Sequence, residues 1–221
     1  MRRRFLVKRM PKRAPLFYTS PGIGGGKARG RTFRLLLDEA RLLVRKGRIP
    51  SVAEVAQSAG VSRATAYRYF PSRSKLIGAL VAEALAPVRE YVPHEGEDGL
   101  ARLKVLIDKT YPRFRKYEAQ MRAALKLALE HKALELAGLL EEEPFRRGQR
   151  REILRLATEP LKKQLSRPAY GRLLNALSVV YGIEPFIVLK DICGASDRET
   201  ESVVRWMIEA LVTSALRQAR A

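Results

Sequence analysis

Two short helices joined by a tight, glycine-containing turn are the feature of this 221-residue sequence that most restricts its fold. Ser51 and Glu54 have the spacing of a capping box, in which each side chain bonds a free backbone N–H group at a helix start. The helix they open ends at Gly60, and Ser62 can cap a second helix, which Pro71 closes. Two such helices around a glycine-containing turn are typical of a helix-turn-helix unit.

Helical spacing of apolar residues continues on both sides of this unit. Before it, one buried helix face is marked by Phe33, Leu36, Leu37, Ala40, Leu43 and Val44, which follow the i, i+3, i+4, i+7 pattern. After it, Ser72 or Ser74 can cap a further helix. Beyond a break containing proline and glycine, two more faces are marked by Leu100, Leu103, Ile107, Tyr111 and Phe114, and by Met121, Leu125, Leu129 and Leu136. The pattern predicts an all-α protein.

The net charge is +20, and most of it lies near the N-terminus. Residues 1–70 hold 17 lysine and arginine residues against three acidic residues, and residues 1–30 hold no acidic residue at all. A basic segment of this kind favours a polyanionic partner, either nucleic acid or an anionic membrane surface. Residues 1–30, which are rich in glycine and proline, predict a disordered basic arm.

The sequence contains no motif that predicts catalysis, a cofactor or a metal. The tract Gly22–Lys27 lacks the spacing of a phosphate-binding loop, and neither Gly-x-Ser-x-Gly nor His-Glu-x-x-His occurs. Cys193, His94 and His131 are too few for a zinc cluster. The lone cysteine suits a reducing compartment. We therefore expect that the protein is not an enzyme and that it has no catalytic residues, no metal site and no cofactor.

Targeting and membrane segments are also not expected. The arginines at residues 2–4 resemble the start of an export signal, but the apolar stretch such a signal needs does not follow. The most apolar run, residues 173–189, is interrupted by Glu184 and Pro185 and predicts one or two buried helices rather than a membrane span. The expected localisation is cytoplasmic, with no membrane partner.

Residues 31–80 resemble the N-terminal domain of tetracycline-repressor-type (TetR) transcriptional regulators. The resemblance rests on the order and spacing of Ser51-Val52-Ala53-Glu54-Val55-Ala56, Ala59-Gly60-Val61-Ser62, Thr65-Ala66-Tyr67-Arg68-Tyr69-Phe70, Ser72-Arg73 and Leu76. It implies a three-helix helix-turn-helix DNA-binding domain at 31–80, followed at 86–221 by a helical bundle for effector binding and dimerisation. Ala66 departs from the family, which often has leucine there, and this removes volume from the core.

The resemblance also implies which side chains contact DNA. Arg63 and Ala64, just after the Ser62 cap, would face base edges. Phosphates would be contacted by Thr65, Tyr67, Tyr69 and Arg73, and by the helix start at Ser51. Arg68 would contact either a base or the backbone. From the residues alone an alternative stays open, in which the two tyrosines are packing residues and the arginines form a solvated face.

Two further sites are expected in the C-terminal part. Tyr111, Phe114, Tyr117 and Met121 could line an apolar effector pocket or form ordinary core. A second capping box, Ser196 to Glu199, opens a last helix whose apolar arc is wide enough to bury one side internally and the other against a second copy. The residues assigned to that dimer face are Val204, Ile208, Leu211 and Ala215.

These expectations combine into one function and one alternative. The first is a ligand-responsive, sequence-specific regulator of transcription, a repressor that an unknown small-molecule effector releases. It would act as a homodimer on a palindromic double-stranded DNA operator. The alternative is a nonspecific nucleic-acid-binding or architectural protein driven by the basic arm.

Overall fold

The computed structural model describes residues 27–91, 93, 96–145 and 149–220. Within these ranges the chain contains helices and no strand, which confirms the all-α prediction. In chain order the elements are α1 (Lys27–Arg45), α2 (Val52–Ser58), α3 (Arg63–Tyr69), α4 (Arg73–Ala84), α5 (Ala86–Arg89), α6 (Gly99–Lys116), α7 (Glu118–Leu136), α8 (Gln149–Ala157), the 3₁₀ helix η1 (Glu159–Lys163), α9 (Arg167–Val180), α10 (Ile183–Ile187), the π-helix η2 (Val188–Ile192) and α11 (Asp197–Arg220).

Helices α1 to α4 form the N-terminal domain and have the caps that the sequence predicts. Ser51 accepts the backbone N–H of Glu54 in a complete capping box, and Ser62 accepts that of Thr65. Ser72, rather than Ser74, caps α4. Helix α1 includes Lys27, so it extends ahead of the residue 31 that periodicity suggests. The rest of the expected arm, residues 1–26, lies outside the described residues.

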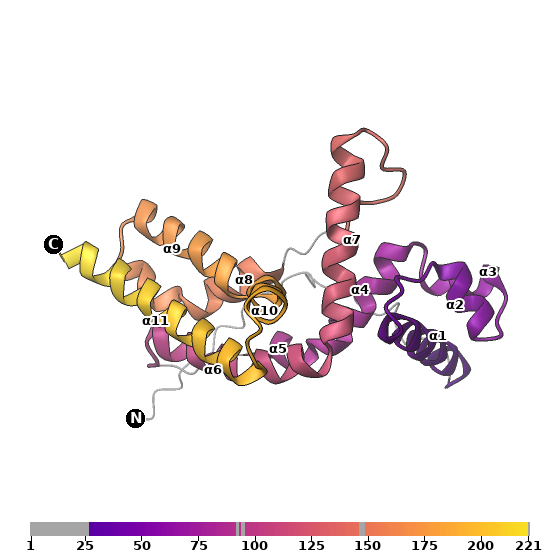
Figure 1. Ribbon diagram of the computed structural model, residues 1–221, viewed down its shortest axis with the longest axis horizontal. Coiled ribbons are helices and arrows are strands. Elements are labelled where there is room, and N and C mark those ends of the chain that lie inside the picture. Colours follow the sequence, from indigo (N-terminus) through magenta and orange to yellow (C-terminus); the bar gives the residue numbers. More distant parts are fainter. Residues whose placement is uncertain (1–26, 92, 94–95, 146–148, 221) are drawn as a thin grey trace, which may run out of the picture.

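Helix α7 stands between this N-terminal domain and the remaining helices, and it packs on α1 and α4 (Figure 1). Its buried contribution to the N-terminal core comes from Ala123, Ala124 and Leu127. The face expected on this helix is confirmed for Met121 and Leu125, which pack in the C-terminal core, and wrong for Leu129 and Leu136, which are 63% and 77% exposed. The small side chains of Ala123 and Ala124 let α7 approach the N-terminal helices, and Leu127 fills the core between them.

The other helices pack around a second core at the opposite end of the molecule (Figure 1). The face predicted for α6 is confirmed, since Leu103, Ile107, Tyr111 and Phe114 are all buried there. The apolar run at 173–189 divides into α9, α10 and η2. Among the described helices none is by itself long and apolar enough to span a membrane; α9 passes that test only together with Ile183–Ile192, and the two are bent by 43°.

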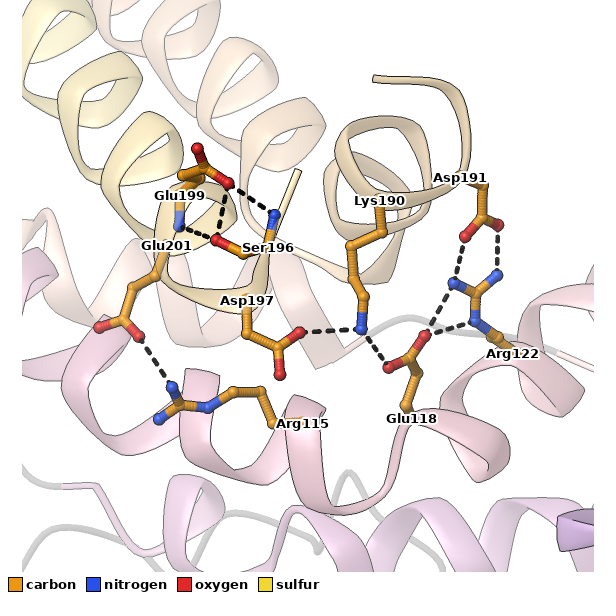
Figure 2. Close-up of polar contacts among 9 residues, drawn as sticks. All are labelled: Arg115, Glu118, Arg122, Lys190, Asp191, Ser196, Asp197, Glu199 and Glu201. Carbon is orange, nitrogen blue, oxygen red and sulfur yellow. Dashed lines mark hydrogen bonds and ion pairs between the residues drawn. The ribbon is translucent and has the colours of Figure 1, made fainter. Parts of the chain in front are cut away.

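A layer of charged side chains holds the N-terminal end of α7 against η2 and α11 (Figure 2). Lys190 places its Nζ 2.8 Å from carboxylate oxygens of both Asp197 and Glu118. Arg122 bonds both oxygens of Asp191, at 2.5 and 2.7 Å, and also reaches Glu118. Hydrogen bonds to Asp197 and Glu118 raise the pKa of Lys190, so this ammonium stays charged at neutral pH. The base of α7 is thus fixed to the C-terminal helices.

Candidate nucleic-acid interface

The turn between α2 and α3 is tight because of two small residues. Gly60 adopts a φ of +65°, a left-handed conformation that glycine takes at little cost. Next to it, the N–H of Val61 donates to the carbonyl of Ala56 at 3.0 Å, which closes the end of α2. The Ala56 side chain is fully buried where the two helices meet. Helix α3 is therefore held across α2 by the turn and by close packing.

Capping defines where each of these helices starts. The Glu54 carboxylate accepts the backbone N–H of Ser51 at 2.8 Å and is also paired with Arg48. The hydrogen bonds from the Ser51 backbone and hydroxyl lower the pKa of Glu54. At α3, the Ser62 hydroxyl accepts the N–H of Thr65 at 3.2 Å and donates to the Thr65 hydroxyl. The N-terminal end of α3 is thus fixed in place, and the side chains of its first two residues, Arg63 and Ala64, are exposed.

Four of the residues expected to contact DNA form the exposed face of α3. Arg63, Ala64, Tyr67 and Arg68 are exposed, and Thr65 is half-buried beside them. Arg63 forms no hydrogen bond or ion pair with any described residue, so its guanidinium is available for an outside acceptor. A short capped helix with arginine at its first turn and tyrosine one turn later has the chemistry of a helix that enters a DNA major groove.

Two residues assigned to phosphate contacts have side chains that are engaged within the chain itself. Tyr69 is only 5% exposed, and its ring packs 6.4 Å from that of Phe33 in the N-terminal core. We therefore correct its assignment from phosphate contact to core, because the ring is covered by α1. Arg73 lies at the start of α4, and its Nη2 donates to Glu130 of α7 at 2.7 Å. Its guanidinium is already bound by a carboxylate of the same chain.

The residues expected to line an effector pocket are brought together only in part. Tyr111, Phe114 and Met121 are buried in the C-terminal core, where the rings of Tyr111 and Phe114 also contact Phe186. Tyr117 lies at the surface edge, with the Arg113 guanidinium 4.5 Å from its ring centroid. The Tyr111 hydroxyl is buried without a hydrogen-bond partner among the described residues, and burial raises its pKa.

The residues expected at a dimer face are divided between interior and surface. Val204 and Ile208 are buried in the C-terminal core, so their assignment to a partner contact is wrong. Leu211 and Ala215 are half-buried against that core. Exposed apolar side chains on α9 and α11 are instead Val179, at 71%, and Trp206, at 68%. Sequence periodicity identified the apolar arc but not which edge faces inward.

The described part of the chain holds no group of three or more His, Cys, Asp or Glu side chains placed to bind a metal ion. Cys193 is exposed and unpaired. His131 is buried on α7, where its Nδ1 accepts the backbone N–H of Phe145 at 3.1 Å. No sequence pattern indicates this bond, which attaches the segment after α7 to the helix.

Comparison with known proteins finds sequence relatives of the N-terminal domain. Residues 40–80 match the family model described as "Bacterial regulatory proteins, tetR family". The HTH-type transcriptional repressor LfrR of Mycolicibacterium smegmatis is 44% identical over 62 residues, which are 28% of this chain and 32% of that protein. An uncharacterized HTH-type transcriptional regulator of Mycobacterium tuberculosis is 35% identical over 57 residues, 26% of this chain and 30% of that one. The chain thus spans about a third of these relatives' length.

The whole fold also has a solved counterpart. The crystal structure of a TetR transcriptional regulator from Rhodococcus sp. RHA1 aligns with a TM-score of 0.50 and covers 83% of this chain and 96% of that one. Sequence identity over the alignment is 20%. The similarity therefore concerns the arrangement of helices, namely a helix-turn-helix domain followed by a helical C-terminal domain.

Proposed function

We propose that this chain, whose residues 40–80 match the tetR family of bacterial regulatory proteins, is a sequence-specific DNA-binding regulator of transcription. The observation that carries the proposal is the exposed face of α3, where Arg63, Ala64, Tyr67 and Arg68 lie on a rigidly capped helix. The basic N-terminal third supplies attraction to the phosphate backbone, which dominates affinity for DNA. The name of the Mycolicibacterium relative supports a repressor.

In this proposal the residues of α3 divide into reading and holding roles. Arg63, at the first position of the helix, reads a base edge, and its planar guanidinium fits guanine O6 and N7. Ala64 lies beside it and leaves room for the groove wall. Tyr67, one turn further on, donates its hydroxyl to a phosphate, a contact that positions the helix but carries no sequence information. Ser51, Ser62 and Thr65 hold the starts of α2 and α3 close to the phosphate backbone of the DNA.

Selection from random duplex DNA with the purified full-length chain tests this proposal. We expect one enriched sequence with two-fold symmetry, because a dimer places two copies of α3 one helical turn apart. The alternative function, nonspecific binding driven by charge, has the net charge of +20 in its favour. It predicts no enrichment and nearly equal affinity for scrambled duplex.

Dimerisation and effector response are part of the same proposal. Helices α9 and α11 lie side by side at the end of the molecule remote from α3 (Figure 1). Trp206 and Val179 expose apolar surface there, which a second copy would cover. Buried polar groups normally have partners, so the Tyr111 hydroxyl, which has none among the described residues, supports a small-molecule effector that bonds to it inside the C-terminal core. The proposal includes no catalysis, metal or cofactor, and it places the protein in the cytoplasm with the DNA.

A further inference from the structure

The first turn of α4 carries two basic side chains next to the helix proposed to enter DNA. Helix α3 ends at Tyr69 and α4 begins at Arg73, with Lys75 two residues later. A DNA backbone that runs past α3 would reach this turn, where Arg73 offers a planar fork and Lys75 a point charge. Both residue types are suited to bind phosphate.

In the structure both side chains are already bound to carboxylates of the same chain. Arg73 Nη2 lies 2.7 Å from Glu130 Oε1, and Arg73 Nε lies 3.9 Å from Glu142 Oε1. Lys75 Nζ lies 2.9 Å from Glu143 Oε2. We call Glu130, Glu142 and Glu143 the acidic clamp. Its members come from α7 and from the segment that follows α7, not from the N-terminal domain.

Further contacts hold the clamp segment on α4. The Ser74 hydroxyl, which is buried, donates to the backbone carbonyl of Glu143 at 3.3 Å. Phe145 packs against the N-terminal core. Its backbone N–H donates to Nδ1 of the buried His131, so the imidazole proton lies on Nε2, which faces Glu142 Oε1 at 3.1 Å. The clamp is therefore a built contact rather than a chance approach of surface side chains.

We propose that the acidic clamp is an autoinhibitory contact in which carboxylates occupy the place of DNA phosphates on Arg73 and Lys75. This inference rests on the proposed function. A guanidinium that bonds Glu130 and faces Glu142 cannot at the same time present its fork to a phosphate, so DNA and clamp compete. The pairs are partly solvated, with 25% of the Arg73 side chain exposed, so each contributes little and DNA can displace it.

The position of the clamp is set by the C-terminal helices. Glu130 lies on α7, and the opposite end of α7 is fixed by Glu118 and Arg122 to η2, whose Lys190 also pairs with Asp197 of α11 (Figure 2). A change in the C-terminal core that shifts α7 therefore moves Glu130 relative to Arg73. This gives the C-terminal helices a direct electrostatic influence on the DNA-binding surface, without any change in α3 itself.

Replacing the clamp carboxylates by amides tests the inference. The variant combines Glu130→Gln, Glu142→Gln and Glu143→Gln in the full-length chain. Its affinity is measured for the selected duplex and for a scrambled duplex at several salt concentrations. We expect binding to both to tighten by about 2- to 10-fold, from the worth of partly exposed ion pairs. The slope of log affinity against log salt should steepen by about 1 for each additional phosphate that the protein neutralises.

A charge-matched control separates the clamp from net charge. Asp108→Asn, Glu152→Gln and Glu209→Gln remove three carboxylates that pair with Arg205, Arg155 and Lys104, on helices away from α4. The affinity of this control should rise less than that of the clamp variant. Adding Arg73→Ala should abolish most of the clamp variant's increase in affinity, and the melting temperature of every variant checks that it is folded.

The outcomes distinguish the two proposals. Wild-type protein that binds DNA, together with a folded clamp variant whose affinity equals that of the control, overturns the clamp and leaves the proposed function standing. If neither wild type nor clamp variant binds any duplex, both proposals are wrong. Binding by the clamp variant alone supports both.

Discussion

Arg63 and Tyr67 lie one turn apart on the exposed face of α3, and their loss should have different consequences. A bidentate arginine–guanine contact contributes about 1–3 kcal/mol of discrimination against the wrong base. Arg63→Ala should therefore relax the preference at one position in each half-site and leave the other positions unchanged. Affinities for a panel of single-base variants of the selected operator measure this. Unchanged base preferences everywhere would mean that α3 does not lie in the groove as proposed.

Tyr67→Phe removes only a hydroxyl and should act on all DNA alike. A phosphate contact contributes similarly to specific and nonspecific complexes, so both affinities should fall by similar factors of about 10- to 150-fold, as for one hydrogen bond to a charged group. The sequence preference obtained by selection should be the same as for wild type. A loss confined to the operator would show instead that Tyr67 contacts a base.

The lowered pKa of Glu54 predicts how the stability of the fold depends on pH. Its pKa is lowered in the folded protein by the hydrogen bonds from Ser51, so its charged form stabilises the fold. That contribution is complete above the ordinary glutamate pKa of 4.5 and is lost as the pH falls through the lowered pKa. Wild type should thus melt above Glu54→Gln at pH 7, and the difference should vanish in acid. A difference that is independent of pH would contradict this account of the cap.

The two tyrosines of α3 show what residue patterns do and do not determine. Tyr67 and Tyr69 look equivalent in composition, yet one is 45% exposed and the other 5%. Residues two apart on a helix point to different sides, so a single groove cannot receive both. That geometry was available from the sequence. The bonding of Arg73 to Glu130 was not, because the two residues are 57 positions apart and meet only through the packing of α7 on α4.

At the scale of elements, α7 belongs to the core of the N-terminal domain as much as to the C-terminal one. Leu127 is fully buried among residues of α1 to α4. Leu127→Ala should lower the free energy of unfolding by about 2–5 kcal/mol, as for other buried leucines. The matched control Leu129→Ala, at a site 63% exposed, should change it by less than about 0.5 kcal/mol. Equal effects in denaturant unfolding would contradict the packing of α7 described above.

Local signals explain why the starts of some helices could be predicted from the sequence and the buried face of α7 could not. The caps depend on residues within one turn, so the sequence predicts those at Ser51 and Ser62 directly and limits the third to Ser72 or Ser74, of which Ser72 is the cap. The buried face of α7 depends on how closely α4 approaches it. There periodicity misassigns Leu129 and Leu136, because the contact with the N-terminal core is made by Ala123, Ala124 and Leu127 on a neighbouring side of the helix.

A substitution on the exposed surface of α11 tests whether the protein forms a dimer. Trp206→Asp places a charge on the exposed apolar surface assigned to a second copy while removing little of the internal core. Leu136→Asp, on an equally exposed leucine of α7, is the control. We expect light scattering to give a dimer for wild type and control and a monomer for Trp206→Asp, whose operator affinity should fall because the two half-sites are no longer linked. A folded Trp206→Asp dimer would contradict this interface.

For the whole molecule, the net charge concerns affinity for any nucleic acid, and the exposed face of α3 concerns the choice of sequence. A net charge of +20 attracts any nucleic acid, whereas the capped α3 with Arg63 exposed offers a means of choosing among sequences. The fold class and the helix-turn-helix unit followed from the sequence. How the C-terminal helices reach the proposed DNA-binding surface through α7 required the structure, because it depends on contacts between distant segments.

The ratio of two dissociation constants tests the central proposal most directly. Full-length protein is titrated at one physiological salt concentration against the selected operator and against a scrambled duplex of equal length and composition. Sequence-specific regulators typically bind their site about 10³- to 10⁷-fold more tightly, and we expect a ratio in that range. A ratio near one would contradict the proposal and favour nonspecific binding through charge.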